Sequence, residues 1–448
     1  MIRKTLFTLQ IVLLALLLNA QDQKEWSLEN CVSFALENNL GLKNQNLTVS
    51  MLTNNNTMAK YNRLPGVNAS TSFQRQFGQT FNQAKLAFVD ESKNQLNASI
   101  RANATVFNGF RYKHDIQKSE YDVEAARADL DIQANDLALN IVNYYLQILY
   151  NREQLNSAEI QLEVTNKQIE RTEALVSAGS SAKGDVLELK AQAANEKAQI
   201  TNYANLERQA RISLKQSMNY SGEAMEVLNP ETINADSLYL QLPPINDVYL
   251  SALEHLPELK AARARIESRI ESIDIAKSDY YPTLDVGASL STFYDQSYPD
   301  PEDPASSYTF FEQAGDFRTA VAYVSLSIPI FNKMQVKYNV QNAQINYEMA
   351  QTDELIVQQN IFKTIESAHS DAQSAHRSFA AAKESLAASE ESFRYAEQRF
   401  NAGLINSVDY NLAKSNLSKA QVAVLNARYE LIFKIKILDF YMGKPLNL

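Results

Sequence analysis

The feature that most constrains this 448-residue chain is a seam of mostly apolar or small residues that return at alternating spacings of four and three. The seam occurs twice, and between its first and last positions neither copy contains Pro or Gly. A sustained 3.5-residue period is that of a coiled coil. The sequence therefore predicts two long helices, over about 108–177 and 332–401, each roughly 100 Å long at 1.5 Å per residue. The first seam comprises Leu130, Ala134, Leu137, Ile141, Tyr144, Ile148, Asn151, Leu155, Ala158, Leu162, Thr165, Ile169, Thr172 and Val176. The second comprises Ile365, Ala368, Ala372, Ala375, Phe379, Ala382, Leu386, Ser389, Phe393, Ala396 and Phe400.

The second half of the chain repeats the first at a nearly constant offset, which indicates an internal two-fold repeat. Each copy reads as helix, helix, two strands, a very long helix, a turn and a return helix. The matched pairs lie 217 residues apart at Pro65 and Pro282, and then 224 apart at Phe107 and Phe331, Gly179 and Gly403, Asp185 and Asp409, and Met218 and Met442.

The expected domain organisation follows from this repeat. A signal peptide at 1–20 precedes a first structural repeat at 21–219, an inter-repeat linker at 220–245, a second repeat at 246–443 and a C-terminal tail at 444–448. The expected strands are about 66–81, 94–107, 283–294 and 318–330, and the expected return helices are about 185–218 and 408–442.

The first 20 residues have the composition of a secretory signal peptide. Arg3 and Lys4 precede a mostly apolar run from Leu6 to Leu18, and Ala20 ends an acceptable cleavage site. A retained anchor is the alternative, but 13 apolar residues are too few to span a bilayer. No later segment approaches 18 apolar residues. An exported chain of this kind is either soluble outside the cytoplasm or enters a membrane through β-strands.

Residue usage argues against an enzyme and against nucleic-acid binding. The single Cys31 and four His leave little material for a nucleophile or a metal site. The net charge of −10, without a basic stripe, is unsuited to phosphate backbones. We therefore expect no cofactor, no metal and no nucleic-acid partner.

The expected strands alternate between polar and apolar residues, as strands with two unlike faces do. Aromatic residues gather near the strand ends, which is typical of outer-membrane strands. A soluble antiparallel sheet with one wet face gives the same alternation, so the strands alone leave both interpretations open. The polar positions that would line a water-filled interior are Asn97, Ser99, Arg101, Asn103 and Ser289.

Four strands cannot close a barrel in lipid, where an open sheet edge is strongly unfavourable. Two chains would supply eight strands around an interior filled by side chains, and three would supply twelve, enough for a passage. We infer a homotrimer with a pore. The long acidic loop at 295–317 fits the outer end of such a barrel.

With these features the chain resembles the outer-membrane efflux protein family, the TolC-like channels, over essentially all of its mature length. The resemblance rests on the repeat, on the tip segments RTEALVSAGSSAKGDVLELKAQ and RYAEQRFNAGLINSVDYNLAKS, and on the junctions VFNGFR and SIPIFNKM. It implies a mainly α protein whose long coiled-coil hairpins form an α-barrel tunnel in the periplasm. It also implies that four β-strands per chain join a trimeric 12-stranded barrel in the lipid of the outer membrane. The implied function is a passive conduit of a tripartite efflux or type I secretion system, served by a periplasmic adaptor and an inner-membrane transporter of the RND or ABC type.

By the same resemblance, the hairpin tips constrict the periplasmic mouth and meet the adaptor. The implied aperture residues are Asp185, Asp409 and Phe400, and the implied adaptor contacts are Gly179, Gly403, Leu404 and Ile405. Carboxylates tripled by symmetry would attract cations, whereas each Asp taken alone reads as a helix N-cap. Ile405 stands where some members have Arg, and Leu412 where some have a second Asp, so this chain lacks those residues of the family's salt-bridge latch and double acidic ring.

Two other functions are compatible with parts of the sequence. A structural coiled-coil protein of the periplasm or cell surface would explain the heptads, but not the paired alternating strands. The second alternative is an envelope enzyme. Its only support is a faint sign of a metal site, because His369 and His376 lie seven residues apart on one helix.

Overall fold

The computed structural model describes residues 26–82, 85–222, 225–228, 242–300 and 308–444. The chain divides into two compact units. The hairpin unit comprises residues up to 47, 128–259 and 355 onward, and the sheet unit comprises 48–127 and 260–354. The expected signal peptide, much of the expected linker and all of the expected tail except Lys444 lie outside the described residues.

The described elements follow a similar order in both halves of the chain, namely helix, helix, strands, long helix and return helix, except that the short helix α9 lies between the strands of the second half. The paired helices also agree in length, because α4 and α10 have 67 residues each and α5 and α11 have 36 and 35. The elements of the first half are α2 (Leu28–Asn38), α3 (Leu40–Tyr61), β1 (Gly66–Gln76), β2 (Gln79–Asn82), β3 (Ala87–Asp90), β4 (Lys93–Asn108), α4 (Arg111–Ser177) and α5 (Lys183–Met218). Those of the second half are α7 (Ile245–His255), α8 (Pro257–Ser278), β5 (Thr283–Asp295), α9 (Phe310–Asp316), β6 (Thr319–Ser327), α10 (Gln335–Asn401) and α11 (Ser407–Tyr441).

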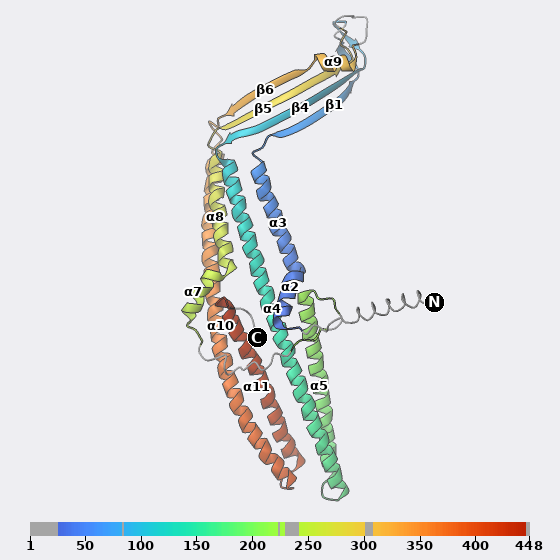
Figure 1. Ribbon diagram of the computed structural model, residues 1–448, viewed down its shortest axis with the longest axis vertical. Helices are drawn as coiled ribbons and strands as arrows, with labels where there is room; N and C mark the ends of the chain where they lie inside the picture. Colours follow the sequence, from blue (N-terminus) through green and yellow to red (C-terminus); the bar gives the residue numbers. More distant parts are fainter. Residues whose placement is uncertain (1–25, 83–84, 223–224, 229–241, 301–307, 445–448) are drawn as a thin grey trace, which may run out of the picture. The chain divides into compact units, whose positions relative to one another are not determined.

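The sheet unit is built on a four-stranded antiparallel sheet of order β1-β4-β5-β6, with β1 and β6 at its edges (Figure 1). Each strand is continuous in sequence with a helix, and polar side chains join the helix ends near the sheet. Arg111 of α4 contacts Asp279, just after α8, at 2.5 Å, and His114 contacts Glu271 of α8 at 2.7 Å. These contacts fix where the chain leaves β4 and where it enters β5.

The structure divides the expected strand 66–81 into two. β1 ends at Gln76, and Gly78 adopts a left-handed backbone with φ +95°, a conformation that Gly takes easily. The following residues form β2, which pairs with β3 in the segment between β1 and β4. The expected strand 318–330 stops at Ser327, before Pro329, whose nitrogen has no proton to donate to a ladder.

The long helices begin three residues later than expected, at Arg111 and Gln335. In each case the two preceding residues are left-handed: Gly109 and Phe110 with φ +65° and +68°, and Lys333 and Met334 with φ +53° and +64°. A right-handed helix cannot include such residues. These two left-handed pairs of residues lie 224 positions apart in the chain.

The hairpin unit contains two helical hairpins, α4 with α5 and α10 with α11 (Figure 1). None of the seam positions predicted for the two long helices is exposed. The main core gathers buried side chains of α2, α4, α5 and α11, among them Cys31, Tyr145, Leu214 and Ile432. Burial raises the pKa of Cys31 to about 12, so its thiol stays protonated and unreactive. No described helix combines the length and the apolar character needed to cross a bilayer.

Candidate functional site

The four-stranded sheet has one polar and one apolar face. Residues directly opposite each other in the ladder share a face, and Arg101 lies opposite both Asn68 and Ser289. The polar face comprises Asn68, Ser70, Ser72, Gln74, Gln95, Asn97, Ser99, Arg101, Asn103, Thr105, Asp285, Ser289, Ser291, Thr319 and Ser325, interrupted by Phe293, Val321 and Tyr323. The other face is mostly apolar, with Val67, Ala69, Thr71, Phe73, Leu96, Ala98, Ile100, Ala102, Ala104, Leu284, Val286, Ala288, Leu290, Ala320, Ala322, Val324 and Leu326, and it also carries Arg75, Asn94, Thr292 and Tyr294 toward the end away from the helices. All five residues predicted to line a water-filled interior therefore lie on one face.

Charged side chains are sparse on the polar face. Arg101 lies in its middle, and Asp285 lies nearer the helix-bearing end, where its carboxylate accepts a hydrogen bond from Thr105 Oγ1 at 2.6 Å. At the opposite end, Lys93 pairs with the buried Asp295 at 3.0 Å. The sequence interpretation did not select these carboxylates, although Asp285 falls on the polar phase of its strand.

Both hairpin tips turn at a left-handed Gly. Gly179 has φ +74° and Gly403 has φ +70°, and a Cβ at either position would meet nothing within 4 Å. The backbone conformation, and not lack of space, therefore favours Gly at both tips. The hydrogen bonds also match, since Ser180 N donates to Leu175 O and Leu404 N donates to Arg399 O, each at 2.8 Å.

Asp185 and Asp409 occupy the same place, the third residue of a return helix, but their contacts differ. The Asp185 carboxylate accepts from Ala182 N at 3.2 Å and from Ser181 Oγ at 2.6 Å, so it helps to cap α5. At α11 the capping side chain is Asn406, which accepts from Asp409 N at 2.9 Å, and Asp409 is exposed. The cap interpretation therefore describes Asp185 in part, whereas the Asp409 carboxylate faces solvent in the single chain.

The predicted aperture residue Phe400 packs inside its own hairpin. Its ring stacks on Tyr410 of α11 with centroids 4.7 Å apart and planes 23° apart. Tyr410 is 1% exposed, and burial raises its pKa to about 12. The most exposed apolar side chain of this tip is Leu404, whereas Ile405 is half-buried. The sequence interpretation missed Tyr410, whose spacing of ten from Phe400 spans the turn and carries no local signal.

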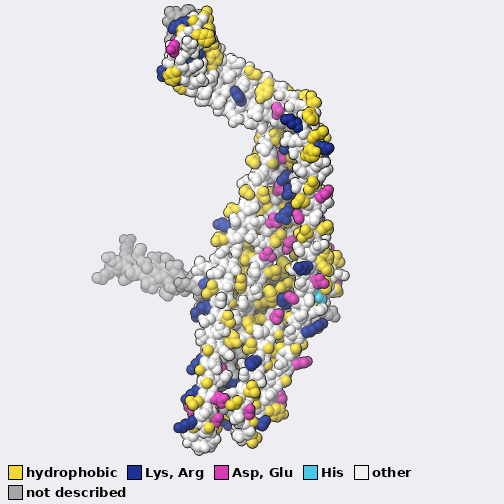
Figure 2. All heavy atoms as spheres, turned by 180° about the vertical axis from the view of Figure 1, so that it is seen from behind, with side chains coloured by type: hydrophobic (Ala, Val, Ile, Leu, Met, Phe, Trp, Pro, Cys, Tyr) yellow, Lys and Arg dark blue, Asp and Glu magenta, His cyan; other side chains and the backbone are white. Residues whose placement is uncertain are grey.

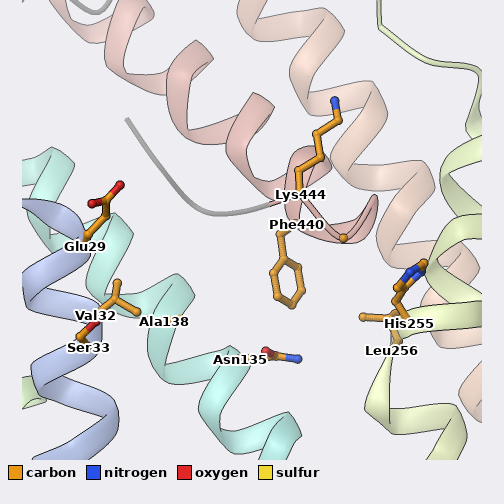
Figure 3. A pocket seen from close by; sticks show the side chains of 10 residues that line it. Glu29, Val32, Ser33, Asn135, Ala138, His255, Leu256, Phe440 and Lys444 are labelled. Carbon is orange, nitrogen blue, oxygen red and sulfur yellow. The ribbon is translucent and has the colours of Figure 1, made fainter.

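One pocket of the hairpin unit is lined by scattered polar groups. A pocket of about 590 Å³ lies among α2, α4, the end of α7 and the end of α11. Figure 3 shows Asn135 and Phe440 between the α2 residues Glu29 and Ser33 and the α7 residue His255. Lys444 Nζ pairs at 3.1 Å with Asp439, a residue outside the pocket lining. The pocket thus has scattered polar groups with no common focus.

The faint metal signal does not gain ligands in the structure. His369 Nε2 lies 3.2 Å from Pro243 O, and among the described residues no three His, Cys, Asp or Glu side chains come together as a metal ion would require.

Figure 2 shows acidic and basic side chains interspersed along the helices of the face it presents.

Comparison with known proteins identifies the family. The family model described as outer membrane efflux protein matches residues 31–220 and 248–443. The outer membrane protein TolC of Escherichia coli is 24% identical over 343 residues, covering 75% of this chain and 67% of TolC. The toxin and drug export protein A of Aggregatibacter actinomycetemcomitans is 20% identical over 412 residues, covering 91% of this chain and 84% of that protein.

The fold has a close counterpart among solved structures. A crystal structure of CusC, described in connection with folding and transmembrane channel formation, superposes with a TM-score of 0.78. The alignment covers 94% of this chain and 93% of CusC at 18% identity. With a family model that matches most of its length and a mainly helical fold of the same kind, this chain belongs to the outer membrane efflux protein family, a family of channel proteins.

Proposed function

We propose that the protein is an outer-membrane channel formed by three copies, each giving four strands to one 12-stranded barrel. The observation that carries this proposal is the two-faced sheet with two edges. Among the described strands, β1 and β6 each pair with one neighbour only. In lipid the unpaired backbone groups of an edge are strongly unfavourable, and pairing β1 of one copy with β6 of the next satisfies them. The polar face then lines water and the apolar face meets lipid.

Exposed apolar stripes on the helices next to both edges support the same assembly. Within the sheet unit, Met51 and Met58 of α3, which leads into β1, are 56% and 58% exposed. On α10, which follows β6, Tyr338, Ile345 and Met349 are 59%, 54% and 59% exposed. Spacings of seven and four are those of a coiled-coil seam. We infer that α3 of one copy packs against α10 of the next, next to the ends of the paired strands that these helices adjoin in sequence.

The proposed activity is passive export from the periplasm through the outer membrane, with the energy supplied by an inner-membrane transporter of the RND or ABC type. The hairpins α4–α5 and α10–α11 would form the periplasmic tunnel, and Gly179, Gly403, Leu404 and Ile405 at their tips would meet a periplasmic adaptor. The relative named toxin and drug export protein A supports small molecules or proteins as cargo.

The proposal is tested by reconstituting the purified protein in a planar bilayer. We expect a trimer that dissociates only on heating and that gives discrete conductance steps. A chain that stays monomeric in detergent and gives no conductance would contradict the channel and favour a structural coiled-coil protein.

The carboxylates at the mouth have a separate test. Replacing Asp185 and Asp409 with Asn keeps side-chain shape and capping ability but removes six charges from a trimer. We expect reduced cation selectivity, measured as the reversal potential in bilayers, and weaker block by a polyvalent cation, measured as the loss of current on its addition. Asp353→Asn, an exposed site on α10 fifty residues before Gly403, removes charge away from the tips and should leave both properties unchanged. Equal behaviour of the tip variant and the control would remove Asp185 and Asp409 from the aperture.

A further inference from the structure

The most deeply buried ion pair among the described residues lies between the two hairpins, away from every residue predicted from sequence to act at the mouth. Lys414 Nζ of α11 lies 3.5 Å from Glu196 Oε1 of α5, and their side chains are 3% and 4% exposed. Lys414 also donates to Thr165 Oγ1 of α4, which is completely buried. The cluster thus takes one residue from each of three helices.

Each polar atom of this cluster has a defined partner. Thr165 Oγ1 lies 2.5 Å from Glu196 Oε2, to which it donates while it accepts from Lys414. Gln192 Nε2 donates to Glu196 Oε1 at 2.9 Å. Burial lowers the pKa of the Lys414 ammonium, and the Glu196 carboxylate opposes that shift. The carboxylate is therefore satisfied by a hydroxyl, an amide and an ammonium, as a buried charge requires.

The cluster lies between the two hairpins and close enough to their tips to affect how far apart the tips are. Thr165 lies 14 residues before Gly179, which corresponds to about 20 Å along α4. Nearer the tips, the two hairpins are joined by the exposed contact of Arg171 Nη1 with Asn401 Oδ1 at 2.6 Å. An exposed contact of this kind contributes little to stability, whereas removing one partner of a buried pair leaves an uncompensated charge.

The equivalent positions in the other half of the chain do not carry the same three residues. The counterparts of Thr165, Glu196 and Lys414 at the offset of 224 are Ser389, Ala420 and Lys190. Ala420 has no carboxylate, and Lys190 pairs at 2.8 Å with Glu173 within its own hairpin, both half-exposed. A contact made by the counterpart residues would therefore lack the buried pair.

We propose that Thr165, Glu196 and Lys414, which we call the buried clamp, hold the two hairpins of each copy together and set the resting width of the periplasmic mouth. The proposal rests on the proposed channel function. Three clamps act in a trimer, one within each copy.

The test compares three variants in hydrogen exchange and in bilayer conductance. Lys414→Met leaves the Glu196 carboxylate buried without its cation, so amides of α11 near Lys414 should exchange about tenfold faster or more. The resting conductance should rise about twofold. The double variant Glu196→Gln/Lys414→Met removes both charges and, with them, the polar contact between the hairpins, so exchange and conductance should both stay above the wild-type values. Lys190→Met, at the counterpart position, should behave as the wild type.

The outcomes separate the clamp from the channel. Folded Lys414→Met protein with wild-type exchange and wild-type conductance overturns the clamp. A double variant that returns to the wild-type values also overturns it, because the loosening would then come only from the unpaired Glu196 carboxylate. If Lys414→Met does not accumulate, Glu196→Gln tests the same contact from the other side. A wild type without trimer or conductance contradicts the proposed function, while the exchange comparison still decides whether the hairpins are clamped.

Discussion

Replacing Gly109 with Ala is expected to destabilise the sheet unit strongly, whereas Gly179→Ala is expected to be tolerated. Both glycines have left-handed backbones, with φ +65° and +74°, so the conformational penalty of about 1–2 kcal/mol is common to the two changes. They differ in surroundings. A Cβ at Gly109 would lie 2.5 Å from Ser278 O and 2.8 Å from Tyr281 Cβ, whereas one at Gly179 would meet nothing within 4 Å.

The clash at Gly109 is severe because its neighbours cannot move independently. Ser278 O accepts a hydrogen bond from Tyr281 N at 3.0 Å, in the turn that leads from α8 into β5. Displacing that turn shifts β5 against β4, and a slip of one residue would exchange the polar and apolar faces. We expect a destabilisation on the order of 4 kcal/mol, with loss of the heat-dissociable trimer.

The measurement is the midpoint of thermal unfolding in detergent, followed by circular dichroism, for both variants. A Gly109→Ala midpoint as high as that of Gly179→Ala would show that the junction adjusts freely and would remove its role in fixing the strands.

Much of the helical architecture could be predicted from sequence because a heptad seam is a local pattern repeated many times. Each seam position reports independently on one face of the helix, and none of them is exposed. Helix starts were harder. Gly109 is a recognisable signal for a left-handed residue, but Lys333 and Met334 adopt the same conformation without any residue type that favours it.

The expected acidic loop at 295–317 contains a sequence signal that predicts the helix α9. Helix α9 starts with a capping box in which the Glu312 carboxylate accepts from Thr309 N at 2.9 Å and from Thr309 Oγ1 at 2.6 Å. The sequence pattern Thr-x-x-Glu predicts such a start. Its short length and the surrounding acidic residues made the segment resemble a loop.

The buried clamp could not be predicted from sequence. Lys414 and Glu196 are residue types that normally face solvent, and only Thr165 falls on a predicted seam. Lys414 is separated in sequence from Thr165 by 249 positions and from Glu196 by 218 positions. Local periodicity says which face of a helix is buried, but not which distant helix covers it.

Adding charge to the exposed stripe of α3 is expected to dissociate the trimer. In the proposed assembly Met51 and Met58 pack against α10 of the next copy, and covering two half-exposed Met side chains stabilises each interface by roughly 2 kcal/mol. In the variant Met51→Glu/Met58→Glu, two carboxylates would be buried without a cation, which is unfavourable by several kcal/mol. Three equivalent interfaces multiply the effect.

The matched control is Thr57→Glu, which adds charge about 100° around the same helix from Met58 at another exposed position. Sedimentation in detergent and unheated gels should find the Met variant largely monomeric and the Thr57 variant trimeric. Because both Met side chains are more than half exposed in the single chain, the monomer itself should keep its helical content. Trimers of wild-type thermal stability in the double variant would mean that this stripe faces lipid or solvent, and that pairing of β1 with β6 alone holds the copies together.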